Sequence, residues 1–222
     1  TGDSRKLGRV DHRTSVLDTH SVEKERGITV FSKQAVLHLD DTEITLLDTP
    51  GHIDFSAETE RTLQVLDYAV LVINGSDGVQ NHTETIWKLL EHYQIPTFIF
   101  INKMDLTGAE QSHVLENIKK HLSDNCVDFS QSDENICEDS AVCCENLMDK
   151  FLSDGVLFDS DLISAIAQRR IFPCFFGSAL KLNGVEEFLS AIDRYTEEPE
   201  HQTEFGAKVY KIAYDSKGTR LT

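Results

Sequence analysis

The sequence predicts an α/β protein built around a mostly parallel sheet. Several apolar runs lack the polar alternation of a half-exposed strand, as expected for strands covered on both faces. The clearest of these runs are Tyr68–Ile73, Thr97–Ile101 and Ile171–Phe176. Stretches with apolar residues at helical spacing lie between them, so strand and helix alternate along the chain.

Two apolar-rich segments near the start of the chain predict a β-hairpin. They span Ile28–Leu39 and Glu43–Leu47, and the acidic turn Asp40-Asp41-Thr42 joins them. The next element is a predicted helix over Phe55–Leu66, with Phe55, Leu63 and Leu66 facing inward.

Three further helices are predicted from apolar residues three and four positions apart. Their inward residues are Ile86, Leu89, Leu90 and Tyr93 in the first, Val114, Leu115, Ile118 and Leu122 in the second, and Val185, Phe188, Leu189 and Ile192 in the third.

One region interrupts this alternation. Between Asp124 and Ser164 the chain carries eleven acidic residues and a single base, Lys150. We interpret residues 124–165 as an inserted, acidic and partly helical excursion with a solvated surface. Leu147, Phe151 and Leu152 are its expected packing anchors.

The pattern changes again near the end of the chain. Lys208–Tyr214 resembles a strand that continues towards Thr222. We therefore expect one α/β domain over residues 1–200, and the start of a β-barrel domain over residues 201–222.

Charge and cysteine content restrict the function. With 21 basic and 38 acidic residues the net charge is −17, which argues against a broad grip on a nucleic-acid backbone. The five cysteines are odd in number and form no C-x-x-C pair, so we expect reduced thiols, a cytoplasmic protein and no zinc site. No apolar run approaches the roughly 20 residues that span a bilayer, so no membrane partner is expected.

The segment Asp48-Thr49-Pro50-Gly51-His52 follows a predicted strand. An acid that leaves a strand tip can address a metal-bound phosphate, and the N–H of the following glycine can contact a terminal phosphate. By itself the segment is equally compatible with an ordinary turn between a strand and a helix.

Two other segments follow predicted strands, at the edge where open α/β sheets bind ligands. They are Asn102-Lys103-Met104-Asp105 and Gly177-Ser178-Ala179. An ionised Asp can accept hydrogen bonds from the ring N–H and the amine of guanine, Asn can bond the base edge, and a Lys stem can cover the purine plane. A backbone N–H of the Ser-Ala segment can donate to the guanine carbonyl. Together the segments predict guanine recognition.

These motifs, together with Arg26-Gly27-Ile28-Thr29, resemble those of the translational GTPases over nearly the whole chain. Elongation factor G and the tetracycline-resistance ribosomal protection proteins are the most similar branches. The phrase Asp77-Gly78-Val79-Gln80, with Phe100-Ile101-Asn102-Lys103 and Gly177-Ser178-Ala179, is more similar to the ribosomal protection branch. The resemblance implies a Ras-like, P-loop NTPase-type G domain in the cytoplasm, with the ribosome (rRNA and ribosomal proteins) as partner.

The resemblance also implies a role for each matching residue. Thr29 and Asp48 would hold Mg²⁺ beside GTP or GDP, the Gly51 N–H would contact the γ-phosphate, and His52 would position the attacking water. The residues that would clasp the guanine are Asn102, Lys103, Asp105, Ser178 and Ala179. The acidic excursion is similar to the insert in the G domain of elongation factor G.

The sequence departs from this family in one respect. It contains no G-x-x-x-x-G-K-[ST] segment, the loop whose backbone N–H groups and lysine cradle the phosphates. The family places that loop, with the first strand, before the position of Thr1. Without it we expect a sheet that lacks a central strand and a chain that binds nucleotide weakly, with residues 11–27 mobile or misplaced.

Two functional hypotheses follow. The first is the G domain of a ribosome-dependent GTPase, in a chain that is inactive by itself because of truncation. The second is a natural remnant that has lost nucleotide binding and acts only as an interaction module. A nicotinamide-dependent oxidoreductase is excluded because no G-x-G-x-x-G follows a strand.

Overall fold

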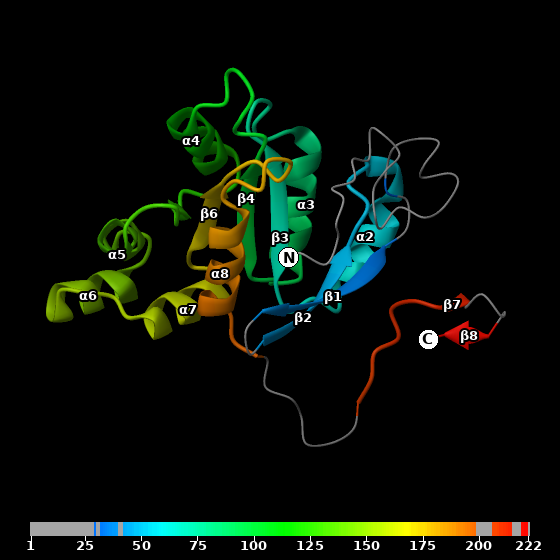
Figure 1. The fold of residues 1–222 in the computed structure, drawn as a ribbon. Helices are drawn as coiled ribbons and strands as arrows, with labels where there is room; N and C mark the ends of the chain where they lie inside the picture. Colours follow the sequence, from blue (N-terminus) through cyan, green and yellow to red (C-terminus); the bar gives the residue numbers. More distant parts are fainter. Residues whose placement is uncertain (1–28, 30–31, 40–41, 199–205, 215–218, 222) are drawn as a thin grey trace. The chain divides into compact units, whose positions relative to one another are not determined.

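The computed structural model describes residues 29, 32–39, 42–198, 206–214 and 219–221. The chain divides into two compact units (Figure 1). The sheet unit is Asp67–Pro199, and the hairpin unit combines Thr1–Leu66 with Glu200–Thr222.

The sheet unit contains a four-stranded sheet in the order β3-β4-β6-β5, and every neighbouring pair is parallel. This confirms the predicted α/β fold with a parallel sheet. The strands are β3 (Ala69–Asn74), β4 (Thr97–Asn102), β5 (Cys126–Asp128) and β6 (Phe172–Phe176). The helices are α3 (Asn81–His92), α4 (Gln111–His121), α5 (Asp133–Ala141), α6 (Glu145–Asp154), α7 (Asp159–Ala167) and α8 (Val185–Tyr195).

Helices pack on both faces of this sheet. On one face Trp87 of α3 meets Phe172 edge to face, with ring centroids 4.7 Å apart. On the other, Phe188 of α8 packs against Phe100 and Phe175, with centroids 5.0 and 5.2 Å away. Because successive strand residues point to opposite faces, β4 is apolar at every position from Phe98 to Ile101 and β6 is apolar throughout, and both strands are almost wholly buried.

The edge strand β3 differs from its prediction. It is as apolar as β4, yet Val70 and Val72 are 41% and 58% exposed, so the expected cover on both faces is wrong here. Ala69, Leu71 and Ile73 are buried on the other face of the strand. Val70 and Val72 pair with Phe98 and Phe100 of β4, but the packing that buries those two rings does not extend over β3.

The acidic insert is more ordered than the sequence indicated. It begins with β5, a three-residue strand at the sheet edge that was not predicted, and continues through α5, α6 and α7. Leu147 is buried and Phe151 half-buried, but Leu152 is 75% exposed, so its prediction as an anchor is wrong. Phe151 lies one helical turn after Leu147 and shares its face, whereas Leu152 is rotated about 140° away.

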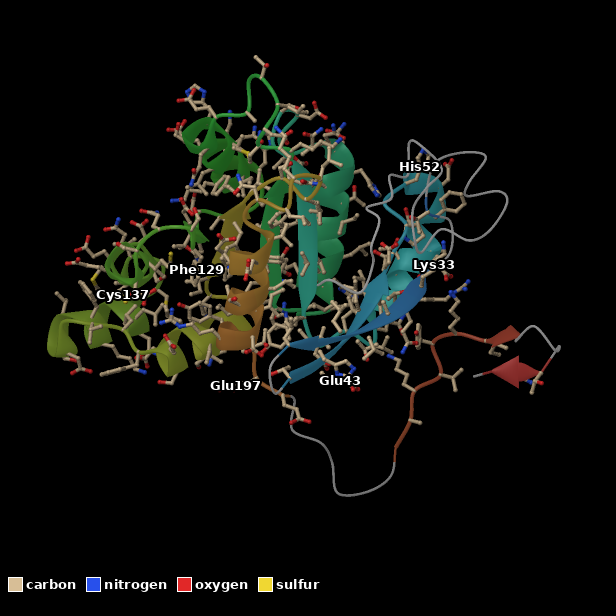
Figure 2. The ribbon with its side chains drawn as sticks, viewed as in Figure 1. Lys33, Glu43, His52, Phe129, Cys137 and Glu197 are labelled. Carbon is tan, nitrogen blue, oxygen red and sulfur yellow. The ribbon has the colours of Figure 1, made fainter. Side chains whose placement is uncertain are left out.

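The hairpin unit contains the predicted β-hairpin. Strand β1 (Lys33–Leu39) pairs antiparallel with β2 (Thr42–Asp48), from Lys33 opposite Asp48 to Leu39 opposite Thr42. Lys33 and Glu43 lie towards opposite ends of this ribbon (Figure 2). A 3₁₀ turn (Ile53–Phe55) and helix α2 (Ser56–Leu63) follow, so the helix is shorter than predicted at both ends.

The C-terminal segment of the hairpin unit is strand-like only in part. Of the predicted strand Lys208–Tyr214, only Ala213–Tyr214 forms a strand, β7, which pairs with β8 (Arg220–Leu221). The assignment of residues 201–222 to a β-barrel domain stays a prediction. The predicted turn at Asp40 and Asp41, and the segment 11–27, lie outside the described residues.

All five cysteines are free thiols, and Cys126, Cys137 and Cys174 are buried. Among the described residues no helix is both long and apolar enough to cross a membrane.

Candidate functional site

The predicted guanine-reading residues follow two neighbouring strands of the sheet unit. Strands β4 and β6 pair in parallel up to Ile101 opposite Phe176, so their carboxyl ends lie at one edge of the sheet. The Gly177 N–H donates to the Ile101 carbonyl at 2.9 Å, and the Met104 N–H donates to the Gly177 carbonyl at 3.0 Å. The backbone thus joins the loop after β4 to the loop after β6.

Asn102 reinforces this connection through its side chain. Its Oδ1 accepts the N–H of Lys103 at 2.8 Å and the N–H of Ala179 at 2.9 Å. Its carbonyl accepts the N–H of Gly75, in the loop after β3, at 2.8 Å. The predicted base-edge residue therefore also holds three loops together, and Ala179 N–H, predicted to face the guanine carbonyl, bonds Asn102 in this structure.

Asp105 meets two side chains of the loop after β6. Lys181 Nζ lies 3.1 Å from its Oδ2, and the carboxylate is about one-fifth exposed, at 20%. The hydroxyl of Ser178 is buried and has no partner at ordinary hydrogen-bond geometry. Its proximity is nevertheless the main reason why the pKa of the Asp105 carboxyl lies below its ordinary value, followed by Lys181 and the backbone N–H of Asp105 itself. Asp105 is therefore an ionised acceptor at neutral pH.

Gly177 allows the loop after β6 to close tightly over the end of β4. A Cβ at Gly177 would lie 2.3 Å from the Asn183 carbonyl oxygen and 2.9 Å from the Phe100 ring. The loop closes on itself, because the Ser178 N–H donates to Asn183 O at 2.9 Å and the Asn183 N–H donates to Ser178 O at 3.1 Å. This closure carries Lys181 back towards Asp105.

The sequence analysis did not identify Lys181 as part of the site. The sequence signal that could have found it is a basic residue three positions after Ser178, in a short loop that follows a strand.

The other predicted site residues belong to the hairpin unit. Asp48 is the last residue of β2 and is half-buried. Pro50 is buried, and its carbonyl accepts a hydrogen bond from Thr59 Oγ1 of α2 at 2.9 Å, which fixes the turn onto the helix. Gly51 is exposed, and nothing lies within 4 Å of the position that a Cβ would take. The backbone there has room for a ligand to approach.

His52 is exposed beside this turn (Figure 2). Its Nδ1 accepts the N–H of Asp54 at 3.3 Å and lies 3.4 Å from the Asp54 carboxylate. Thr29 is half-buried. The two halves of the predicted site lie in different units, so the roles of these residues together stay a prediction.

The predicted Mg²⁺ site would use Thr29 and Asp48. Among the described residues no three His, Cys, Asp or Glu side chains are grouped as a metal cage. Mg²⁺ commonly uses one or two carboxylates with waters and substrate phosphates, so a single Asp48 at a strand end fits that donor set.

Three segments of the hairpin unit meet at Glu58 of α2. Its Oε1 accepts the Ser32 N–H at 3.3 Å and lies 3.3 Å from Lys211 Nζ, which also donates to the Ser32 carbonyl. Burial raises the pKa of the Glu58 carboxyl, but the Ser32 and Lys211 contacts outweigh it, and the pKa lies below its ordinary value. This contact joins the residue before β1 to α2 and to the C-terminal segment.

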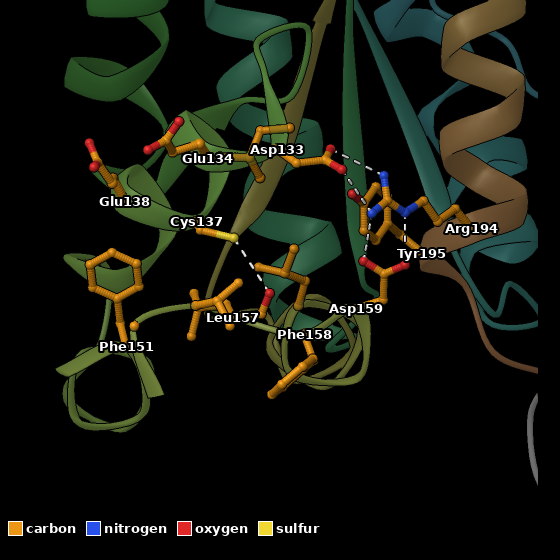
Figure 3. A pocket seen from close by; sticks show the side chains of 14 residues that line it. Asp133, Glu134, Cys137, Glu138, Phe151, Leu157, Phe158, Asp159, Arg194 and Tyr195 are labelled. Atoms are coloured by element: carbon orange, nitrogen blue, oxygen red, sulfur yellow. Dashed lines mark hydrogen bonds and ion pairs between the residues drawn. The ribbon is translucent and has the colours of Figure 1, made fainter. Parts of the chain in front are cut away.

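The insert contains a separate pocket of about 650 Å³ between α5, α6, α7 and α8 (Figure 3). Arg194 of α8 crosses its rim and binds Asp133 of α5 at 3.2 Å and Asp159 of α7 at 2.8 Å. These two acids raise the pKa of the guanidinium, and burial raises the pKa of the adjacent Tyr195 to about 12. The charged groups satisfy one another, so we interpret them as a clamp that holds the insert to α8.

Comparison with known proteins identifies the family of the chain and a solved structure with a similar fold. The family described as Elongation factor Tu GTP binding domain matches residues 1–198. A crystal structure of a protein from Thermus thermophilus superposes with a TM-score of 0.83 at 21% sequence identity. The match covers 99% of this chain and 40% of that protein, so the chain spans about two-fifths of the length of the structure it resembles.

Proposed function

Because the chain belongs to the family of elongation factor Tu-type GTP-binding domains of translational GTPases, we propose that Asn102, Lys103, Asp105, Ser178 and Ala179 form its guanine site. The parent protein is then a ribosome-associated translation factor that hydrolyses GTP, with rRNA and ribosomal proteins as its partners.

The observation that carries this proposal is the cross-linked pair of loops at the carboxyl ends of β4 and β6. Asn102 Oδ1 reaches the Ala179 N–H, and the Asp105 carboxylate is held ionised by the loop of Ser178 and Lys181. An ionised acceptor suits the two donors on the edge of guanine, whereas the corresponding edge of adenine presents an acceptor. The two loops are already joined to each other in the free chain, which supports base recognition by loops that are held in place before the base binds.

The turn of the hairpin unit would act at the phosphates. Asp48 and Thr29 would hold Mg²⁺, which supplies charge neutralisation at the phosphoryl oxygens when it is bound. The open surroundings of Gly51 leave its N–H accessible to a phosphate oxygen. His52, exposed beside it, would orient the attacking water.

We expect the chain alone to bind nucleotide weakly, since its sequence lacks the G-x-x-x-x-G-K-[ST] loop that cradles phosphates. Binding would then depend on the base, with a Kd on the order of 1 mM. GDP and GMP should bind almost equally, because the second phosphate has no cradle to contact.

The experiment is a titration of the chain with GDP, GMP and ADP in Mg²⁺, followed by backbone amide signals. Shifts at Lys103 and Ala179 with GDP and GMP, but not with ADP, are expected. Adding a strand–loop–helix segment with the phosphate loop should tighten GDP binding to micromolar or below and leave GMP weak. No guanine-dependent shift at 10 mM, a concentration about tenfold above the expected Kd, contradicts the proposal.

A second candidate is an interaction module that has lost nucleotide binding. The same titration separates the two, because a remnant should stay unresponsive to guanine nucleotides even after the segment is added.

Within the family, we favour the tetracycline-resistance ribosomal protection proteins, with elongation factor G as the other branch. The phrases Asp77-Gly78-Val79-Gln80 and Phe100-Ile101-Asn102-Lys103 support this choice. The test is whether the parent protein releases tetracycline from ribosomes or instead promotes translocation.

A further inference from the structure

Lys181 contacts the proposed guanine site but belongs to neither of its two motifs, Asn102-Lys103-Met104-Asp105 and Gly177-Ser178-Ala179. It lies on the loop after β6, and its side chain is 62% exposed. Its Nζ is 3.1 Å from Asp105 Oδ2, across the gap between the loops after β6 and β4. Exposed ion pairs generally contribute little to the stability of a fold. We therefore looked for a role of the Lys181–Asp105 contact in ligand binding.

The surroundings of Asp105 show what the contact can do. The loop that bears Asp105 is exposed from Leu106 to Gly108, and Gly108 adopts a positive φ of 93°, whereas the Asp105 side chain is 20% exposed. A carboxylate on such a loop is free to rotate unless donors hold it. The side-chain donors beside it, Ser178 and Lys181, both belong to the loop after β6.

That loop is itself firmly placed. Ser178 and Asn183 exchange two backbone hydrogen bonds, and Ala179 is tied to Asn102. Gly177 fits only because it lacks a side chain. Lys181 therefore reaches Asp105 from a fixed base.

We propose that Lys181 is a positioning residue that orients the Asp105 carboxylate towards the two donors of a guanine edge. The inference rests on the proposed function. Each carboxylate oxygen has two acceptor sites, so Oδ2 can keep Lys181 and still accept a base N–H. Fixing the carboxylate before the base arrives reduces the rotational freedom that binding must otherwise remove.

The test uses the full 222-residue chain and amide-signal titrations with GMP and IMP, which lacks the 2-amino donor of guanine. Lys181→Met should weaken GMP binding about three- to tenfold, and IMP binding less, because IMP offers only one donor to the carboxylate. Lys181→Arg, which keeps a charged donor, should restore GMP binding to within about twofold of wild type. Lys120→Met, at an exposed cation of α4, is the matched control for the loss of one positive charge.

A double-variant cycle separates positioning from general attraction of the phosphate. In an Asp105→Asn background, titrated with XMP, adding Lys181→Met should change the affinity by less than about 1.5-fold, because the carboxylate that Lys181 orients is gone. An equal loss in both backgrounds would mean that Lys181 acts on the phosphate, and it would overturn the inference.

The remaining outcomes are also decisive. If wild type and Lys181→Met bind GMP equally, or if the variant binds it more tightly, Lys181 does not position Asp105 and the inference fails alone. If wild type shows no guanine-dependent shift, the proposed function fails, and the inference fails with it.

Discussion

Single glycines differ in how tightly the surrounding chain packs around them. Gly177 packs where any Cβ would strike the Asn183 carbonyl oxygen, whereas Gly51 has open space around it. Both glycines belong to motifs, but only one of them is required by packing. The structure thus separates a glycine needed for folding from one available to a ligand.

This distinction gives a paired prediction. Gly177→Ala should lower the free energy of unfolding by about 1–3 kcal/mol, since backbone must move to relieve the overlap. Gly51→Ala should change it by less than about 0.5 kcal/mol. Urea unfolding followed by circular dichroism measures both. Equal destabilisation by the two variants would show that the close approach at Gly177 is not as described.

Glu58 provides a prediction of pH dependence. Its pKa is lower in the folded state, so its charge adds stability above the unfolded-state pKa and loses that contribution as the pH falls through the folded-state pKa. At pH 7, Glu58→Gln should therefore be less stable than wild type by about 0.5–1 kcal/mol, after allowing for solvent screening. The difference should shrink as the pH falls below the unfolded-state pKa of a glutamate and should disappear once the pH lies below the folded-state pKa.

The control for this variant is Glu116→Gln, which removes an exposed carboxylate of α4. It should show no comparable loss at pH 7. A stability difference for Glu58→Gln that persists unchanged into acid would mean that the Ser32 and Lys211 contacts do not depend on its charge.

Among single residues, the sequence predicted the members of recognisable motifs but not their partners. Asn102, Asp105 and Ser178 follow apolar strands at a spacing that base recognition explains. Lys181 and the dual role of Asn102 depend on how the loop from Gly177 to Gly184 closes, and this is set by contacts between loops far apart in the chain.

Among the helices and strands, one arginine adds charged contacts to the apolar packing that holds the insert against α8. Arg194 meets Asp159 and Asp133 from two different helices and lies 4.9 Å over the ring of Tyr195. One side chain thus links α5 and α7 to the last helix of the core, beside the apolar cluster that these helices share with α8.

Removing that side chain should loosen the insert without unfolding the sheet. Arg194→Met should increase amide hydrogen exchange in α5 and α7, with a local loss of about 0.5–1 kcal/mol, and leave β4 and β6 protected. Arg194→Lys should rescue only part of the loss, because a lysine cannot bind two carboxylates through a planar fork. Exchange that rises equally in β4 would show that the clamp stabilises the whole unit.

The strands and helices also show what a pattern cannot predict. Long apolar runs identified β4 and β6, and helical spacing identified α3, α4 and α8. The three residues of β5 are too few for a pattern, and nothing in Tyr68–Ile73 distinguishes Val72, which is exposed, from its buried neighbours. Whether a strand is covered depends on which elements pack beside it.

Taken as a whole, the chain combines a parallel sheet, for which we propose a base-reading edge, with a hairpin unit, for which we propose a phosphate-sensing turn. Alternating strands and helices were enough to predict the fold class, and the family match over residues 1–198 agrees with it. The proposed function requires that the sheet edge reads guanine through the carboxylate of Asp105, which is ionised at neutral pH.

The decisive measurement is the base preference of Asp105→Asn, obtained by titrating the chain with GDP and XDP. Wild type should prefer GDP, and the variant should prefer XDP by about tenfold or more, because an amide can donate to the xanthine 2-oxo group where a carboxylate repels it. A variant that binds GDP and XDP in the same ratio as wild type would show that Asp105 does not read the base.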